Sequence, residues 1–280
     1  MKTSTESHYV DLWIDGGKSP LPPHDHLVCV RDGAVAHLVL NRPARRNAIS
    51  VDIWQRLIRV LRELESDASV KLIVLRGAGT KAFSGGADIA EFAAVYANVE
   101  TASNYNAAVR AAQLTLEQLE KPTMAVVYGA CVGGGFGLAL ACDMRFAESD
   151  ARFGIPASKL GVAYSVPDTR RLVALVGPSR AKDILYSGRL VQASEALTLG
   201  MVDRVVSASL LESVAADYAR VLLSNSLQAI CTAKRIINSV AGVHPQPEAT
   251  LDARFTASFK SEDFKEGYSA FLEKRIAKFK

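Results

Sequence analysis

Short apolar runs alternate along this chain with longer stretches in which apolar residues recur at helical spacing. The first two runs, 27–30 and 36–40, flank Asp32-Gly33, a dipeptide that favours a tight turn, so we expect a β-hairpin there. Further runs typical of buried strands follow at 72–75, 124–127, 144–147, 151–153 and 202–206. Strands that alternate with helices indicate an α/β protein.

Helical spacing is clearest after Ser50, a residue type that commonly caps helices, and it continues to about Glu65. Other helices are expected at about 91–119, at 136–141, from Gly177-Pro178 onward and at 193–199, and from Ser207 the pattern is helical only. We therefore divide the chain into a polar, irregular N-terminal extension (1–26), an α/β core (27–206) and an appended helical region (207–280).

Two glycine-rich segments stand out, Phe83–Ile89 and Gly133–Gly137. Each follows a strand-like run and leads into a helix-like run, and such turns leave backbone N–H groups unpaired at a helix start. Two of these groups facing one point would form an oxyanion hole, a pair of donors aimed at a carbonyl oxygen that becomes negative. The pattern thus indicates stabilisation of an enolate or a tetrahedral oxyanion.

Composition limits the kinds of molecule that the protein is expected to bind. The 280 residues carry a net charge of +4, scattered without the dense basic stripe of nucleic-acid-binding proteins. The four cysteines lie far apart and form no CxxC pair, which fits a reducing compartment and argues against a metal site. Neither a signal-peptide pattern nor an apolar run of membrane-spanning length is present. We expect a cytoplasmic protein that binds neither nucleic acid nor membranes.

Common catalytic motifs do not explain the glycine segments. GxxxxGK[ST] and GxSxG are absent, and Leu138 stands where the last glycine of GxGxxG would follow Gly133 and Gly135. The five histidines lie away from both segments in sequence, and His37 alternates within a predicted strand, which favours a structural role. Backbone N–H groups remain as the main groups available for catalysis.

Five ordered stretches resemble the enoyl-CoA hydratase/isomerase (crotonase) family from about residue 27 to the end of the chain. They are Leu40–Ser50, Phe83–Ile89, Tyr128–Gly135 with Ala141-Cys142-Asp143 after it, Ala193–Val202 and Asp263–Arg275. The resemblance implies a crotonase-like spiral of ββα turns with a C-terminal helical oligomerisation region. It also implies a homotrimer or homohexamer and an acyl-CoA thioester substrate, with coenzyme A entering as part of the substrate and no permanently bound cofactor.

The same resemblance assigns residues to the site. The hole donors would be the N–H groups of Ala87 and Gly134, and helix 134–141 would begin at the second of these. Arg45 and Arg46 would lie near the CoA phosphates, although a solvated basic turn is the alternative interpretation. Residues that would border the adenine and pantetheine are Ala48, Gly85, Asp88 and Ile89, for which simple packing is the alternative.

The chain departs from the family pattern where hydratases carry two glutamates. On a straightforward alignment these positions hold Gly137 and Ala157. Tyr164 lies in a run similar to the pocket segment of methylmalonyl-CoA decarboxylases, where a tyrosine orients the substrate carboxylate, so it is a candidate catalytic residue. Ser165 and Asp168 stand near the place where other members carry an aspartate, and for Asp168 we favour a first-turn helix charge.

We conclude that the chain is an acyl-CoA-processing enzyme of the hydratase/isomerase type that stabilises a thioester enolate in a backbone oxyanion hole. Two alternatives stay open. One is decarboxylation of a malonyl-type acyl-CoA with the help of Tyr164, a reaction that needs no base. The other is an acyl-CoA-binding paralogue without turnover, which the missing glutamates would explain.

Overall fold

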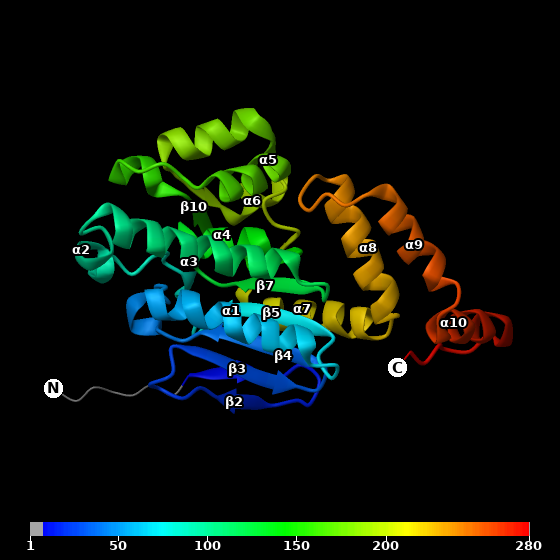
Figure 1. The fold of residues 1–280 in the computed structure, drawn as a ribbon. Helices are drawn as coiled ribbons and strands as arrows, with labels where there is room; N and C mark the ends of the chain where they lie inside the picture. The colour runs from blue at the N-terminus through cyan, green and yellow to red at the C-terminus, as the bar shows by residue number, and fades with distance from the viewer. Residues whose placement is uncertain (1–7, 280) are drawn as a thin grey trace.

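The computed structural model describes residues 8–279, and the chain winds through two sheets in a repeating pattern of strand, strand and helix (Figure 1). Successive turns place one strand in a large sheet and the next in a small sheet before a helix returns the chain. This arrangement confirms the predicted α/β spiral.

Six strands form the large sheet, and all neighbours are parallel except the predicted hairpin, in which Asp32 pairs with Val35. In spatial order they are β12 (Arg204–Val206), β9 (Met144–Glu148), β7 (Thr123–Val127), β5 (Leu72–Gly77), β4 (Val35–Leu40) and β3 (Leu27–Asp32). Strands β5, β7 and β4 are buried along their whole length. Continuous apolar runs are expected of parallel strands that are covered on both faces.

The small sheet carries the strands that lead into the glycine segments. Its order is β11 (Leu190–Gln192), β10 (Arg152–Gly154), β8 (Ala130–Val132) and β6 (Ala82–Ser84). Strands β6, β8 and β10 are parallel neighbours, so their carboxyl ends meet at one edge of the sheet.

Helices cover the large sheet on both faces. On one face lie α1 (Val51–Ser66), α3 (Val99–Gln118) and α4 (Gly134–Ala141), and on the other lies α7 (Ala208–Leu223). Of the remaining helices of the spiral, α2 (Phe92–Val95) packs on α3, α5 (Val166–Ser187) packs on α4, and α6 (Ala193–Thr198) contacts β10, β11 and β12. The main apolar core joins one face of the sheet to α1, α3 and α4, and a second core joins the other face to α7. In α1, the Ser50 side chain accepts the Ile53 N–H, as its predicted capping role requires.

After α7 the chain is helical only, as predicted. Helices α8 (Leu227–Val240), α9 (Glu248–Ser258) and α10 (Glu262–Glu273) stand to one side of the layered sheets (Figure 1). Few of their residues are buried, whereas α7 buries Leu211 and three alanines against the sheet.

The structure corrects two expectations about elements. Residues 8–26 are not an irregular tail: β1 (Tyr9–Asp11) and β2 (Lys18–Pro20) form an antiparallel pair. Val10 and Leu21 pack in a small core with β3 and β4 residues. The remaining extension residues, 1–7, lie outside the described part of the chain. The predicted helix at 91–119 is divided between α2 and α3, because Asn98 and Thr101 form a capping box that starts a new helix.

Candidate active site

The two glycine segments meet at the carboxyl edge of the small sheet. Gly86 follows β6, Gly133 follows β8, and both have positive φ angles of 96° and 55°. A Cβ atom added to Gly86 would lie 3.0 Å from the Val132 carbonyl oxygen and 3.6 Å from the Gly134 nitrogen. The close approach and the positive φ explain why glycine is required at position 86.

The N–H groups of Ala87 and Gly134 are both available at this junction. Ile49 donates to the Gly86 carbonyl at 2.8 Å, and Asp88 donates to the Ile49 carbonyl at 3.1 Å, so the peptides on either side of Ala87 are fixed. Among the described residues, neither the Ala87 N–H nor the Gly134 N–H donates a hydrogen bond to the protein. Gly134 is the first residue of α4, where the helix dipole favours negative charge. Two unpaired donors on adjoining turns are what an oxyanion hole requires.

An arginine-rich turn lies next to these donors. The carboxylate of Asp88 is buried; it accepts from Arg42 at 2.7 Å and lies 3.4 Å from Arg45. Burial opposes ionisation of Asp88, but the Arg42 hydrogen bond and the charges of both arginines outweigh it and lower the pKa of this carboxyl. Arg46 is exposed and adopts the left-handed conformation with a φ of 51°.

The other residues expected to border the carrier surround the same turn. Gly85 donates to the Arg46 carbonyl at 2.7 Å, and the Ala48 carbonyl accepts from Arg42 at 2.9 Å. Ile89 is 68% exposed at the start of a 3₁₀ turn, Ile89–Glu91. The structure thus gathers every residue of the predicted carrier set at the arginine turn. An open groove lies beside this turn, and of that set only Arg45 and Asp88 line it.

Three residues along α4 from Gly134, Gly137 faces a polar wall. A Cβ at Gly137 would overlap the side-chain amide of Gln113 and would lie 3.0 Å from Asp168 Oδ1 and 3.2 Å from the Tyr164 hydroxyl. The Tyr164 hydroxyl also donates to the Gly133 carbonyl oxygen at 3.4 Å. Burial raises the pKa of Tyr164 well above its ordinary value, so its hydroxyl stays protonated.

A buried ionic cluster supports this wall. Asp168 bonds to Arg171 at 2.9 Å, and Arg171 makes two bonds to Glu117 at 2.7 and 2.9 Å. With its amide oriented to donate, Gln113 reaches both oxygens of Asp168 at 3.0 and 3.2 Å. Burial raises the pKa of the Asp168 carboxyl despite these partners.

The position of Asp168 agrees with the expectation of a first-turn charge in α5, whose cap is Ser165. The burial of the Asp168 carboxylate was not expected from the sequence. Sequence reasoning also missed Gln113, Glu117 and Arg171 as neighbours of the site. The available signal was the four-residue spacing of Gln113 and Glu117, which puts two polar groups on the buried face of α3.

Comparison with known proteins decides the family. A sequence model described as enoyl-CoA hydratase/isomerase matches residues 31–280. The chain belongs to the enoyl-CoA hydratase/isomerase family. Its relatives include the short-chain-enoyl-CoA hydratase of Clostridium acetobutylicum, 35% identical over 254 residues that span 90% of this chain and 96% of the relative. The crotonyl-CoA hydratase of Syntrophomonas wolfei is 34% identical and covers 91% of this chain and 98% of its own.

Solved structures agree with the sequence relatives. A hydratase/isomerase family protein from Hyphomonas neptunium superposes with a TM-score of 0.89 at 40% identity, covering 92% of this chain and 98% of its own. The enoyl-CoA hydratase of Bacillus anthracis gives 0.86 at 32% identity, with 91% and 99% covered. This member of the hydratase/isomerase family is therefore an acyl-CoA-processing enzyme, as the sequence resemblance indicated.

Proposed function

We propose that this enzyme binds the thioester carbonyl oxygen of an acyl-CoA between the N–H groups of Ala87 and Gly134 and stabilises the enolate that forms there. The observation that carries the proposal is the junction of the two glycine turns, with both N–H groups unpaired in the described chain. An enolate oxygen carries more charge than the substrate carbonyl, so the two donors bind the reacting state more strongly than the ground state.

The acyl group would then extend toward Gly137, where Tyr164 is the polar hydrogen donor that the substrate meets. The Tyr164 hydroxyl has one proton, so to hold a substrate carboxylate or carbonyl oxygen it must turn away from the Gly133 carbonyl, 3.4 Å away. Being protonated, it cannot accept the proton that water loses during hydration. Asp168 is the nearest carboxyl group to Gly137, and its Arg171 and Ser165 partners keep it occupied. Hydratase-like activity is the family default; malonyl-type decarboxylation is the alternative that Tyr164 favours.

The carrier would lie along the arginine turn. We propose Arg45 and Arg46 as partners of the CoA phosphates, with Ala48, Gly85, Asp88 and Ile89 beside the adenine and pantetheine. Support comes from the bonds of this turn to Gly85 and Asp88, which stand on either side of Ala87 in the chain. Asp88 would act indirectly, because its carboxylate holds Arg42 and Arg45. Coenzyme A would enter and leave with the substrate.

We also propose a homotrimer or homohexamer in the cytoplasm. Aromatic side chains on α9 and α10 follow one another with ring centroids 5.1, 5.4 and 6.3 Å apart, and all are about half exposed: Phe255, Phe259, Phe264 and Tyr268. A row of exposed aromatics is typical of a surface that another subunit covers.

Among residues 8–279, no helix has the length and apolar character needed to cross a membrane. Buried free cysteines at 131 and 142 fit a reducing compartment.

Turnover of defined thioesters tests the proposed reaction. Crotonyl-CoA and methylmalonyl-CoA are offered to the purified enzyme, and hydration and CO₂ release are followed. Hydration of the first supports hydratase-like activity, and CO₂ release from the second supports the decarboxylase alternative. If both esters bind tightly and a broad panel of acyl-CoAs gives no turnover, enolate catalysis at this site is wrong.

A further inference from the structure

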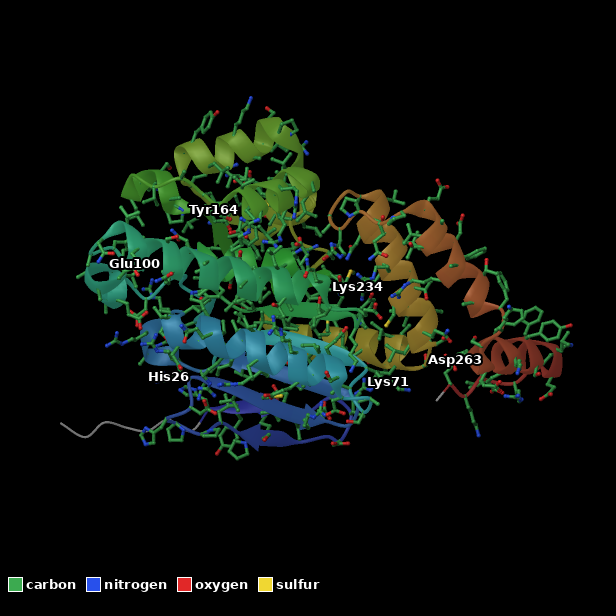
Figure 2. The ribbon with its side chains drawn as sticks, in the orientation of Figure 1. His26, Lys71, Glu100, Tyr164, Lys234 and Asp263 are labelled. Atoms are coloured by element: carbon green, nitrogen blue, oxygen red, sulfur yellow. The ribbon has the colours of Figure 1, made fainter. Side chains whose placement is uncertain are left out.

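A buried glutamine on α3 fills the space beside Gly137. The side chain of Gln113 is 1% exposed, and a Cβ atom added to Gly137 would lie only 2.3 Å from one atom of its amide group. Asp168 Oδ1 and the Tyr164 hydroxyl oxygen lie 3.0 and 3.2 Å from the same point. Figure 2 shows Tyr164 between α3 and α5, the two helices that carry Gln113 and Asp168. Three polar groups from different segments therefore converge on the place toward which the acyl group would extend.

Asp168 fixes the orientation of the Gln113 amide. One atom of the amide lies 3.0 and 3.2 Å from the two oxygens of Asp168, and Arg171 and Ser165 donate to the same carboxylate at 2.9 and 2.7 Å. A carboxylate held by these donors only accepts hydrogen bonds, so the amide NH₂ group must face it. In the opposite orientation, the amide oxygen would lie against two carboxylate oxygens and would gain only a bond of 3.5 Å from Arg171. The amide oxygen therefore faces Gly137.

The amide oxygen of Gln113 lacks a donor in this orientation. Among the described residues, no group donates a hydrogen bond to the amide atom on the Gly137 side. The Tyr164 hydroxyl borders the same point, but it donates its one proton to the Gly133 carbonyl. Polar atoms in a protein interior are nearly always paired, so an unpaired acceptor at a proposed site indicates a donor on the ligand.

The charges behind this wall disfavour a further carboxylate. Asp168 and Glu117 share the buried guanidinium of Arg171, and the half-exposed Arg170 lies 3.8 Å from Glu117. The buried part of the cluster thus holds two carboxylates and one guanidinium. A carboxylate on the acyl group would meet the Gln113 amide oxygen and Asp168 Oδ1, which are both acceptors, whereas a hydroxyl group brings the proton that they lack.

We propose that Gln113 is a specificity-determining residue of the acyl site, whose amide oxygen accepts a hydrogen bond from a hydroxyl group on the acyl chain and disfavours a carboxylate in the same place. This inference rests on the proposed acyl-CoA function, and it names the acyl class as hydroxyacyl rather than malonyl-type. Asp168 is a positioning residue in this role, because it acts through the amide that it orients.

The test compares dissociation constants of acyl-CoAs, measured by calorimetry with the full-length enzyme. Butyryl-CoA, 3-hydroxybutyryl-CoA and methylmalonyl-CoA differ in the polar group that the acyl chain carries. In the wild type, the hydroxyl group should improve binding about fivefold over butyryl-CoA, which is the worth of one neutral hydrogen bond. Methylmalonyl-CoA should bind no better than butyryl-CoA.

Variants separate specificity from structural support. Gln113→Met keeps the length of the side chain and removes the acceptor, so the advantage of the hydroxyl group disappears. Gln118→Met, at an exposed position of the same helix, is the matched control and keeps the fivefold advantage expected above. In Asp168→Asn the amide of Gln113 can turn either way, because its partner then both donates and accepts. The hydroxyl advantage should shrink there, and methylmalonyl-CoA should gain affinity relative to butyryl-CoA. A merely structural role would weaken all the thioesters by the same factor and leave their ratios unchanged.

Each result decides the inference. Equal affinities of the wild type for butyryl-CoA and 3-hydroxybutyryl-CoA overturn it and leave the proposed oxyanion hole untouched, and so does a hydroxyl advantage that survives in Gln113→Met. If Gln113→Met does not fold, Asp168→Asn decides, and unchanged ratios in that variant overturn the role of the amide. If the wild type binds none of the thioesters, the proposed function is wrong and the inference falls with it.

Discussion

The hydroxyl of Tyr164 donates a hydrogen bond to the carbonyl oxygen of Gly133, 3.4 Å away. That carbonyl shares one planar peptide with the Gly134 N–H, so the two groups point in opposite directions from the same rigid unit. The bond from Tyr164, together with the Gly137 N–H at 3.0 Å, fixes the tilt of this peptide. Through the Gly133 carbonyl, Tyr164 therefore orients the Gly134 N–H, a proposed hole donor, on the other side of the same peptide. Its hydroxyl also lies beside Gly137.

Tyr164→Phe removes this bond and keeps the ring. We expect kcat to fall about fivefold, which corresponds to one neutral hydrogen bond of about 1 kcal/mol, with a smaller change in KM. The infrared stretch of the bound thioester carbonyl should shift back toward its value in water, because the donor is less well aligned. Tyr186→Phe, at an exposed position near the end of the following helix, α5, is the control. An unchanged carbonyl stretch would contradict the orienting role.

Gly134→Pro tests the hole donor itself. Proline lacks the N–H but suits the first position of a helix, and Gly134 is the first residue of α4. Gly134→Ala is the matched control, because in both variants the Cβ meets the Trp54 ring at about the same 3.1 Å distance while only alanine keeps the N–H. Steady-state kinetics should show kcat about 10²–10³ lower for proline than for alanine. Similar rates in the two variants would exclude Gly134 as a donor.

Gly137→Ala should be destabilising because the added methyl group overlaps the Gln113 amide. We expect a loss of about 1–3 kcal/mol in the free energy of unfolding, measured with a chemical denaturant. In a Gln113→Ala background the same substitution should cost less than about 1 kcal/mol, because the obstructing amide is gone. Equal costs in both backgrounds would show that Gln113 does not fill this space.

The buried His37 should make stability dependent on pH. Burial, with the Arg76 charge second, lowers the pKa of His37 to about 4 even though Asp32 lies 3.4 Å away. The unfolded chain binds a proton near pH 6.5 and the folded chain only near pH 4, so stability declines as pH falls between these values. The decline amounts to about 3 kcal/mol.

Unfolding free energies at pH 4, 5, 6 and 7 measure this decline. His37→Phe keeps an aromatic ring against Trp13, whose ring centroid lies 4.7 Å away, and it removes the titrating group. The slope of the variant between pH 6 and pH 4 should be flatter than that of the wild type by about one bound proton. Parallel slopes would mean that His37 is protonated in the folded state across this range.

Local sequence signals were enough to predict an α/β core and the two glycine turns, whereas the spiral was implied by the family resemblance. The Asp32-Gly33 turn, the Ser50 cap and the glycines at 86 and 133 each act within a few residues, so the sequence shows them directly. Neighbouring parallel strands then bring the two turns together.

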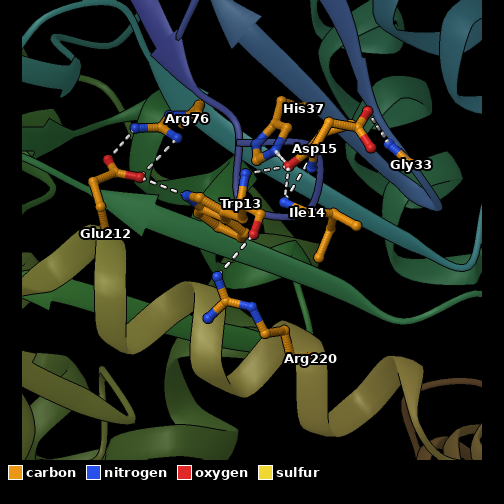
Figure 3. Close-up of polar contacts among 9 residues, drawn as sticks. Trp13, Ile14, Asp15, Gly33, His37, Arg76, Glu212 and Arg220 are labelled. Atoms are coloured by element: carbon orange, nitrogen blue, oxygen red, sulfur yellow. Dashed lines mark hydrogen bonds and ion pairs between the residues drawn. The ribbon is translucent and has the colours of Figure 1, made fainter. Parts of the chain in front are cut away.

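The missed features depend on contacts between distant segments. Trp13 is buried in the second core and donates its indole N–H to Glu212, about 200 residues later (Figure 3). Gln113 faces Asp168, which another helix places opposite it. The spacing of Gln113 and Glu117 shows only that two polar groups share a face of α3, and no local pattern around residue 13 or residue 113 identifies the distant partner. Burial of Asp168 was missed for the same reason, since Arg171 and Glu117 make it tolerable.

The position of the two proposed hole donors after neighbouring strands has a consequence for the evolution of the enzyme. Ala87 and Gly134 each follow a strand of one ladder, β6 and β8, so main-chain pairing helps to set their separation. Mutations that exchange the groups around the acyl carbons leave that spacing untouched. A lineage can thus lose one pair of acid and base residues and recruit another while the carbonyl-polarising element is inherited unchanged.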